Sequence, residues 1–126
     1  MARLHHQHVR AALHELREAR NELRNARGDF GGHRDKALRA IDDAEGSLKA
    51  MMRAWGEDFR GIDRNPDFYR RHRDFPRLRQ TVEDLRSARD ELNSARGEFD
   101  NLRFRAMRDL DDAVEQIRLV LKYAGR

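Results

Sequence analysis

The sequence predicts an all-α protein, a four-helix bundle made of two tandem antiparallel helical hairpins. Three observations predict this fold. Charged residues make up 40% of the chain and hydrophobic residues 38%, a balance typical of amphipathic helices. Apolar residues recur with a seven-residue period, and two long segments match each other at an offset of 69 residues. A chain of 126 residues is long enough for one hydrophobic core, so we interpret residues 1–126 as a single domain.

The internal match divides the chain into two repeats. The segment L-R-E-A-R-N-E-L-R-N-A-R-G-D-F, which begins at Leu16, lies over L-R-S-A-R-D-E-L-N-S-A-R-G-E-F, which begins at Leu85. Further along, A-L-R-A-I-D-D-A from Ala37 lies over A-M-R-D-L-D-D-A from Ala106. We therefore expect an internal duplication, with repeat 1 at about residues 4–55, a connection at about 56–75 and repeat 2 at about 76–125.

Each repeat contains two segments whose apolar residues alternate at steps of three and four, the spacing of a coiled-coil seam. In the first helix of each repeat these residues are Val9, Ala12, Leu16, Ala19, Leu23, Ala26 and Phe30, matched by Leu78, Thr81, Leu85, Ala88, Leu92, Ala95 and Phe99. In the second helix they are Ala37, Ile41, Ala44, Leu48, Met51 and Trp55, matched by Ala106, Leu110, Ala113, Ile117, Val120 and Ala124. The spacing predicts one antiparallel hairpin in each repeat.

A second apolar stripe indicates that the hairpins pack on each other. It consists of Met107, Val114 and Leu121 in the last predicted helix, with Leu13, Val82, Leu38 and Met52 in the other three. We expect these residues to be core, with no cofactor among them. The helices should be about 22 to 25 residues long, or roughly 35 Å.

The hairpin turns carry glycines where a left-handed residue would end the preceding helix. Gly28 and Gly97 stand at this position, and glycine adopts it without a side-chain clash. We expect Phe30 and Phe99 to plug the closed ends of the seams, and Asp100 or its neighbour Asn101 to cap the last helix.

The connection from Gly56 to Phe75 is long for a bundle, in which two to eight residues usually join neighbouring helices. A segment of this length can cross the bundle or lie over its open end. The sequence therefore leaves open whether the two turns lie at the same end or at opposite ends.

Histidines near the start of the chain are candidate metal ligands. His5 and His8 are three residues apart and share a helix face, and we expect His72 and the stretch of Trp55, Glu57 and Asp58 to lie near them. Two imidazoles and a carboxylate suit a divalent transition metal such as Zn, Ni or Cu. The alternative is an ordinary surface, because repeat 2 has Asp74 and Arg77 in place of His5 and His8.

The first turn differs from the second by its Gly-Gly-His sequence. Gly31, Gly32, His33 and Arg34 could hold an anion or a partner, with main-chain N–H groups at a helix N-terminus as donors. The alternative is structural: His33 packs against Phe30 and bonds to a carbonyl or to the carboxylate of Asp29, since its counterpart in repeat 2 is the apolar Leu102.

Arginines alternate with aromatic residues between residues 64 and 79, a mixture that can neutralise phosphates and stack on bases. The candidate nucleic-acid residues are Phe68, Tyr69, Arg70, Arg71 and Arg73. The net charge of +4 agrees with such a role. The alternative is that the aromatic residues pack on the bundle while the arginines stay in water.

The pattern H-x-x-V-x-x-A-L-x-x-L-R-x-A-R-x-E-L, followed by F-G-G-H-R-x-K-A-L-x-A-I-D-x-A, resembles a group of small bacterial helical-hairpin proteins with a Gly-Gly-His-Arg turn. The resemblance covers His8 to Ala44, is degenerate in repeat 2, and implies no activity.

No catalytic motif is present, so we expect a protein without enzymatic activity whose role is structural or in protein interaction. Its expected partner is an unknown protein or a second copy of the chain. Nucleic-acid binding and metal binding are the alternatives. The sequence has no signal peptide or membrane span, so the expected location is the cytoplasm.

Overall fold

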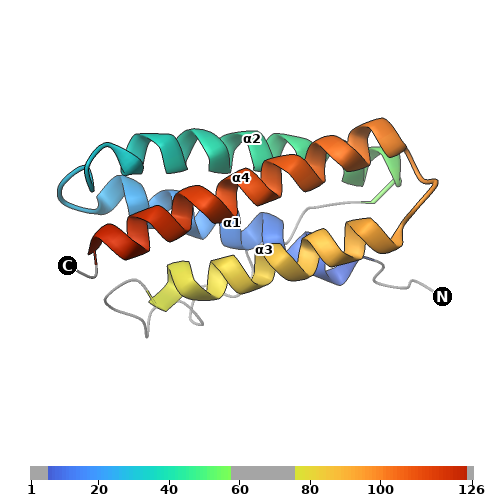
Figure 1. Cartoon of the computed structure of the whole chain (residues 1–126). Coiled ribbons are helices and arrows are strands. Elements are labelled where there is room, and N and C mark those ends of the chain that lie inside the picture. Colours follow the sequence, from blue (N-terminus) through green and yellow to red (C-terminus); the bar gives the residue numbers. More distant parts are fainter. Residues whose placement is uncertain (1–5, 58–75, 125–126) are drawn as a thin grey trace.

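A computed structural model describes residues 6–57 and 76–124 (Figure 1). Within these ranges the chain forms four α-helices and no strand: α1 at Gln7–Asn25, α2 at His33–Ala54, α3 at Pro76–Ser94 and α4 at Asp100–Ala124. The helices pack together, so the prediction of an all-α four-helix bundle is confirmed. None of the described helices combines the length and the apolar character needed to cross a membrane.

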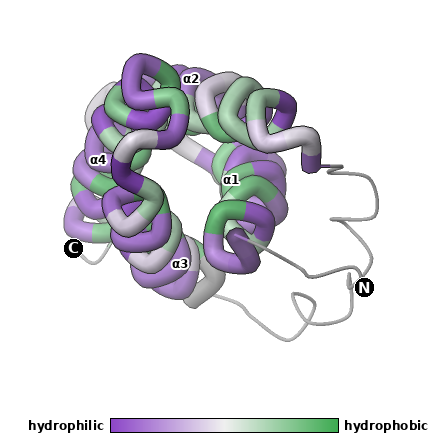
Figure 2. The backbone as a smooth tube through the Cα atoms, turned by 90° about the vertical axis from the view of Figure 1, so that its right-hand side faces the viewer, coloured by the Kyte–Doolittle hydropathy of each residue, from purple (hydrophilic) through white to green (hydrophobic). Residues whose placement is uncertain are grey.

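The helices lie at the corners of a square when the bundle is viewed along its axis (Figure 2). α1 packs against α2 and α3, and α4 packs against the same two helices. Neighbouring helices run antiparallel, and the turn after α1 lies at the opposite end of the bundle from the turn after α3 (Figure 1). The sequence left open whether the two turns lie at the same end or at opposite ends, and the structure places them at opposite ends.

The core contains the residues that the seven-residue spacing selects. Leu16, Leu48, Leu85 and Ile117, one from each helix, are fully buried. The second stripe also turns inward: Leu13 and Met52 are fully buried, Val82 and Met107 nearly so, and Leu38, Val114 and Leu121 are partly buried against the core. Burial of apolar surface from all four helices is the main force that holds such a bundle together.

The two turns begin with the same backbone conformation. Gly28 and Gly97 both have φ of 85°, which confirms their predicted left-handed conformation. Phe30 and Phe99 follow with φ of 51° and 50°, a region that side chains other than glycine rarely adopt. The prediction that Phe99 plugs its seam is wrong, because it leaves the helical conformation and its residue is 50% exposed. Phe30 packs only in part against the core.

The helix ends differ in detail from the predicted ones. α1 and α3 have 19 residues each, fewer than expected, because each stops before its glycine turn. Asp100 is the first residue of α4, and its Oδ1 accepts hydrogen bonds from the N–H of Gly97 at 3.0 Å and from Nε of Arg103 at 3.2 Å. Its carboxylate thus joins the turn to α4 and lies where the helix dipole favours negative charge.

Candidate functional site

The predicted metal site falls largely outside the described residues, because His5 and His72 are not among them. His8 is exposed at the start of α1. Among the described residues no group of three histidine, aspartate, glutamate or cysteine side chains is arranged to hold a metal ion. Metal binding at His5, His8 and His72 therefore stays a prediction.

The same end of the bundle gathers a different set of side chains around Trp55. The imidazole of His6 stacks on the indole of Trp55, with 3.4 Å between ring centroids and 4° between planes. Nδ1 of His6 lies 2.8 Å from Oε2 of Glu57, and Nε1 of Trp55 donates to Oε1 of Glu98 at 3.0 Å. The expected neighbourhood of Trp55 and Glu57 is therefore present, but the histidine that enters it is His6. Its left-handed φ of 59° places it before the first turn of α1.

The N-terminus of α1 receives a cap from another helix. Both carboxylate oxygens of Glu91 in α3 accept main-chain hydrogen bonds, from His8 at 3.2 Å and from Val9 at 3.0 Å. These N–H groups have no acceptor within their own helix. A carboxylate at this end is also stabilised by the positive N-terminal end of the helix dipole. This contact was not predictable from the sequence, since it requires α1 and α3 to be antiparallel neighbours.

The amides of the Gly-Gly-His turn have acceptors inside the turn itself. The main-chain oxygen of Asp29 accepts from the N–H groups of Gly32 and Arg34, each at 3.1 Å, and the oxygen of Phe30 accepts from His33 at 3.2 Å. Oδ1 of Asp29 accepts from the N–H of Gly31 at 3.1 Å. An anion at the predicted site would therefore have to displace these bonds. The four predicted residues do lie together at the start of α2.

The ring of Tyr123 lies against Gly31, and both this contact and the backbone conformation disfavour a larger residue there. A Cβ atom at Gly31 would lie 2.8 Å from Cε2 of Tyr123, closer than such contacts occur, and φ of Gly31 is 67°. The ring of His33 meets the same tyrosine edge to face, with centroids 6.2 Å apart. The end of α4 therefore packs on the first turn. In the second turn Asp100 takes the place of Gly31 and begins a helix.

The predicted nucleic-acid residues Phe68, Tyr69, Arg70, Arg71 and Arg73 lie outside the described residues. Of the stretch 64–79, the structure describes only the beginning of α3, where Leu78 is buried and Arg79 is exposed. Nucleic-acid binding through this stretch stays a prediction.

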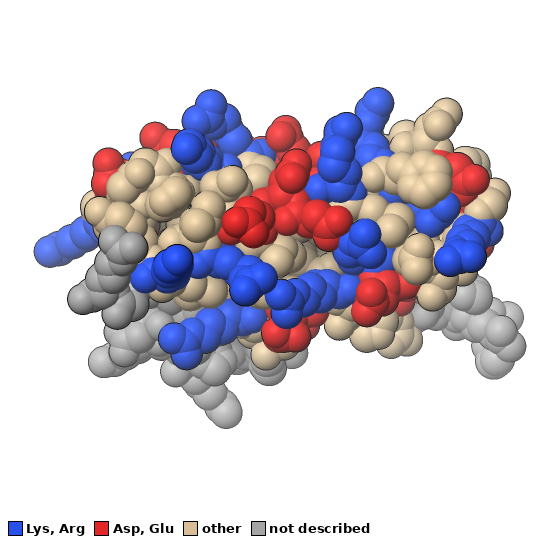
Figure 3. All heavy atoms as spheres, in the orientation of Figure 1, with Lys and Arg blue, Asp and Glu red and all other residues tan. Residues whose placement is uncertain are grey.

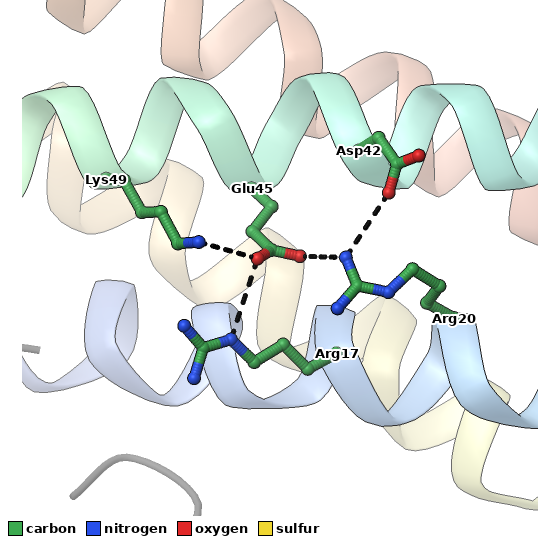
Figure 4. Close-up of polar contacts among 5 residues, drawn as sticks. All are labelled: Arg17, Arg20, Asp42, Glu45 and Lys49. Atoms are coloured by element: carbon green, nitrogen blue, oxygen red, sulfur yellow. Dashed lines mark hydrogen bonds and ion pairs between the residues drawn. The ribbon is translucent and has the colours of Figure 1, made fainter. Parts of the chain in front are cut away.

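An ion cluster around the buried Glu45 joins α1 to α2 (Figure 4). Glu45, only 6% exposed, lies 2.9 Å from Nζ of Lys49, 2.6 Å from Nη1 of Arg20 and 3.6 Å from Nε of Arg17. Nη1 of Arg20 also lies 3.3 Å from Oδ1 of Asp42. Burial raises the pKa of Glu45, but the bond from Lys49 and the charges of Arg20, Lys49 and Arg17 outweigh it and bring the pKa below its ordinary value. The cluster holds an ionised carboxylate between two helices.

Two further polar contacts lie between helices that are not consecutive. Ser47 of α2 donates a hydrogen bond to Oδ2 of Asp109 in α4, and both residues are buried. Thr81 of α3 lies 3.5 Å from Oε2 of the buried Glu15 in α1. Sequence reasoning missed both pairs, because each partner comes from a different repeat.

These contacts define the class of protein: a four-helix bundle whose buried polar side chains cap helix ends and join helices. No protein-family model, characterised protein or solved structure that we compared with the chain matches it.

Proposed function

We propose that this protein is a non-enzymatic helical bundle with a structural or protein-interaction role, built from two tandem copies of one helical hairpin. The observation that carries this proposal is the use of its buried charged side chains. Glu45 joins α1 to α2, Asp109 joins α4 to α2, and Arg103 bonds to the end of α3. Each of these groups is committed to holding the bundle together.

The matched turns support the duplicated hairpin. The left-handed residues Gly28 and Phe30 have counterparts of nearly equal φ in Gly97 and Phe99. The repeated arginine after each turn also acts alike, because Nη1 of Arg34 donates to the oxygen of Ala26 at 3.2 Å and Nη1 of Arg103 donates to the oxygen of Leu92 at 3.3 Å. Each arginine donates to a carbonyl at the end of the preceding helix, where the last carbonyls lack the N–H donors that a continuing helix would supply.

The proposal is tested with the tagged full chain in extracts of its native host, treated with nuclease, and by light scattering of the purified protein. We expect a retained protein partner or a mass above that of one chain. A chain that stays monomeric, retains no protein and instead binds mixed RNA or DNA with a steep loss of affinity in salt would overturn the proposal in favour of nucleic-acid binding.

A further inference from the structure

Two polar grooves lie side by side between α2 and α4. The first encloses about 440 Å³, and its lining includes Arg105, Arg108 and Gly46. The second encloses about 370 Å³, and its lining includes Lys36, Arg39 and Gln116. Asp43 and Asp109 line both grooves, so the two grooves adjoin each other along the bundle, and we refer to them together as the depression between α2 and α4.

The two grooves correspond to each other through the repeat. An offset of 69 residues carries Lys36 to Arg105, Arg39 to Arg108, Asp43 to Asp112 and Ser47 to Gln116. Because α2 and α4 are antiparallel, an approximate twofold axis relates the matched residues. The axis passes through the middle of the surface that α2 and α4 form, which we call the α2–α4 face. The first member of each pair comes from α2 and the second from α4.

The exposed charges follow the same symmetry. Asp43 and Asp112 lie in the middle of the face, beside the buried Asp109 that bonds to Ser47, while Lys36 with Arg39 lies toward one end and Arg105 with Arg108 toward the other. Figure 3 shows acidic side chains gathered over the middle of α2 and α4, with basic side chains on both sides. The face therefore has an acidic centre and two basic flanks.

Most of these charges have no partner in the described part of the chain. The side chains of Lys36, Arg39, Asp43, Arg105 and Asp112 make no hydrogen bond or ion pair there. The charges between α1 and α2 are paired with each other instead (Figure 4). Unpaired charges of both signs in a fixed pattern can select a partner with the complementary pattern.

Several residues of α2 that line the depression have small side chains. Ala40, Ser47 and Ala50 are small, and Gly46 has no Cβ. Nothing lies within 4 Å of the position that a Cβ of Gly46 would take, and this glycine is helical, so neither packing nor backbone conformation requires it. A glycine inside a helix costs about 0.5–1 kcal/mol relative to alanine. Its position leaves room for a partner to approach α2 closely.

We propose that the α2–α4 face docks a helical segment of a partner protein that carries basic side chains at its centre and acidic side chains at both ends. This inference rests on the proposed interaction role. The depression runs along α4 from Leu102 to Gln116, which are 14 residues apart, or about 21 Å of helix, so a partner segment of about four turns fills it. A second copy docked about the twofold axis would bring the two acidic centres together, so the face does not complement itself.

The test uses two helix-stapled peptides of the same composition. One has lysines in its middle turns and glutamates in its outer turns, and the other has the reverse order. Binding to the full chain is measured by fluorescence anisotropy at low salt. We expect the first peptide to bind at least about tenfold more tightly than the second. Equal affinities, or no binding of either peptide, would overturn the proposal.

Three variants locate the binding. Lys36→Glu with Arg105→Glu should remove the preference for the first peptide, because both flanks then repel its glutamates. Gly46→Gln should weaken binding by narrowing the depression, and the fold should tolerate it because a Cβ at this helical position meets nothing within 4 Å. Arg24→Glu with Arg27→Glu, at two exposed positions outside both grooves, reverses the same number of charges and should bind like the wild type.

The same variants separate this inference from the proposed function. If the Gly46→Gln protein retains its cellular protein partner and both peptide affinities, the interaction role stands and the α2–α4 face is not the docking site. A dimer that Gly46→Gln dissociates would assign the face to a second copy, and this too would overturn the proposal.

Discussion

The guanidinium of Arg103 donates a hydrogen bond from Nη1 to the main-chain oxygen of Leu92 at 3.3 Å and thereby ties the start of α4 to the end of α3. Arg103 is 4% exposed. Its Nε donates to Asp100 at 3.2 Å, and its guanidinium carbon lies 4.5 Å from the ring centroid of Phe104. One buried side chain thus holds both sides of the second turn.

Replacement of Arg103 by methionine should destabilise the protein. The methionine keeps much of the apolar stem but loses the guanidinium bonds to the oxygen of Leu92 and to Asp100, while that oxygen keeps its bond from the N–H of Ala95 at 3.1 Å. Loss of a hydrogen bond from a charged group costs about 1.5–3 kcal/mol. Urea unfolding at pH 7 measures the change. The control is Arg105→Met, at an exposed position that makes no ion pair or hydrogen bond among the described residues. Equal effects at the two positions would refute the role of Arg103.

Replacement of Glu45 by glutamine should destabilise the protein at neutral pH and less so in acid. Glu45 has a lowered pKa in the folded state, so the stability it adds is fully present above its ordinary pKa of about 4.3 and is lost as the pH falls through the folded-state value. We expect a loss of about 1–3 kcal/mol at pH 7, because the cations Arg20 and Lys49 lose a buried ionic acceptor. Urea unfolding at pH 7, 5 and 3 measures the difference from wild type.

The control for Glu45 is Asp42→Asn. The carboxylate of Asp42 is 53% exposed and, within residues 6–57 and 76–124, pairs only with Arg20, so its loss should cost less than about 1 kcal/mol. A Glu45→Gln difference that stays constant from pH 7 to pH 3 would contradict the ionised cluster.

Replacement of Asp84 by asparagine should stabilise the protein at neutral pH. Burial raises the pKa of Asp84, and the bond from Gln80 and the charge of His8 offset this only in part. A carboxyl group with a raised folded-state pKa favours the folded state below its ordinary pKa, and this contribution is lost as the pH rises through the folded-state value.

Asparagine at position 84 avoids burial of the charge and still presents Oδ1 to Nε2 of Gln80, which donates to it at 3.0 Å in the wild type. The gain at pH 7 should be less than about 1 kcal/mol and should vanish below about pH 4. Thermal melting at pH 7 and below about pH 4 measures the change in stability, with Asp90→Asn at an exposed position as the control. A lower melting temperature for Asp84→Asn at pH 7 would show that the charge of Asp84 is stabilising.

The sequence predicts the helices and their core because both depend on local periodicity. Leu23, Leu92 and Leu110 are buried at the positions where the spacing of three and four residues places them. The left-handed glycines are also predictable, because Gly28 and Gly97 adopt a conformation that few other residues tolerate. These features follow from a few neighbouring residues at a time.

The contacts between the ends of the bundle were not predictable, because the length of the connection allows the turns to meet or to lie apart. Only the opposite placement brings Glu91 to the start of α1 and Tyr123 to Gly31. The repeat could not reveal the ion cluster either, since the counterpart of Glu45 in the second repeat is the apolar Val114. The available signal was an ionisable residue in the second apolar stripe of one repeat, at the position where the other repeat has a valine.

Replacement of Gly31 by alanine should destabilise the protein for two separable reasons. A left-handed residue with a Cβ costs about 1–2 kcal/mol, and the Cβ of Ala would also lie 2.8 Å from the ring of Tyr123. In a Tyr123→Ala background the second cost disappears, so Gly31→Ala should cost less there than in the wild type. A double-mutant cycle in urea measures the coupling between the two positions.

Gly46→Ala is the control for Gly31→Ala. Gly46 is helical, and a Cβ added to it meets nothing within 4 Å, so neither cost applies there. This replacement should raise the free energy of unfolding by about 0.5–1 kcal/mol, since alanine is the better helix former. If Gly31→Ala costs the same with and without the tyrosine ring, then the backbone conformation alone requires glycine in the first turn, and the packing of Tyr123 on Gly31 contributes nothing to that requirement.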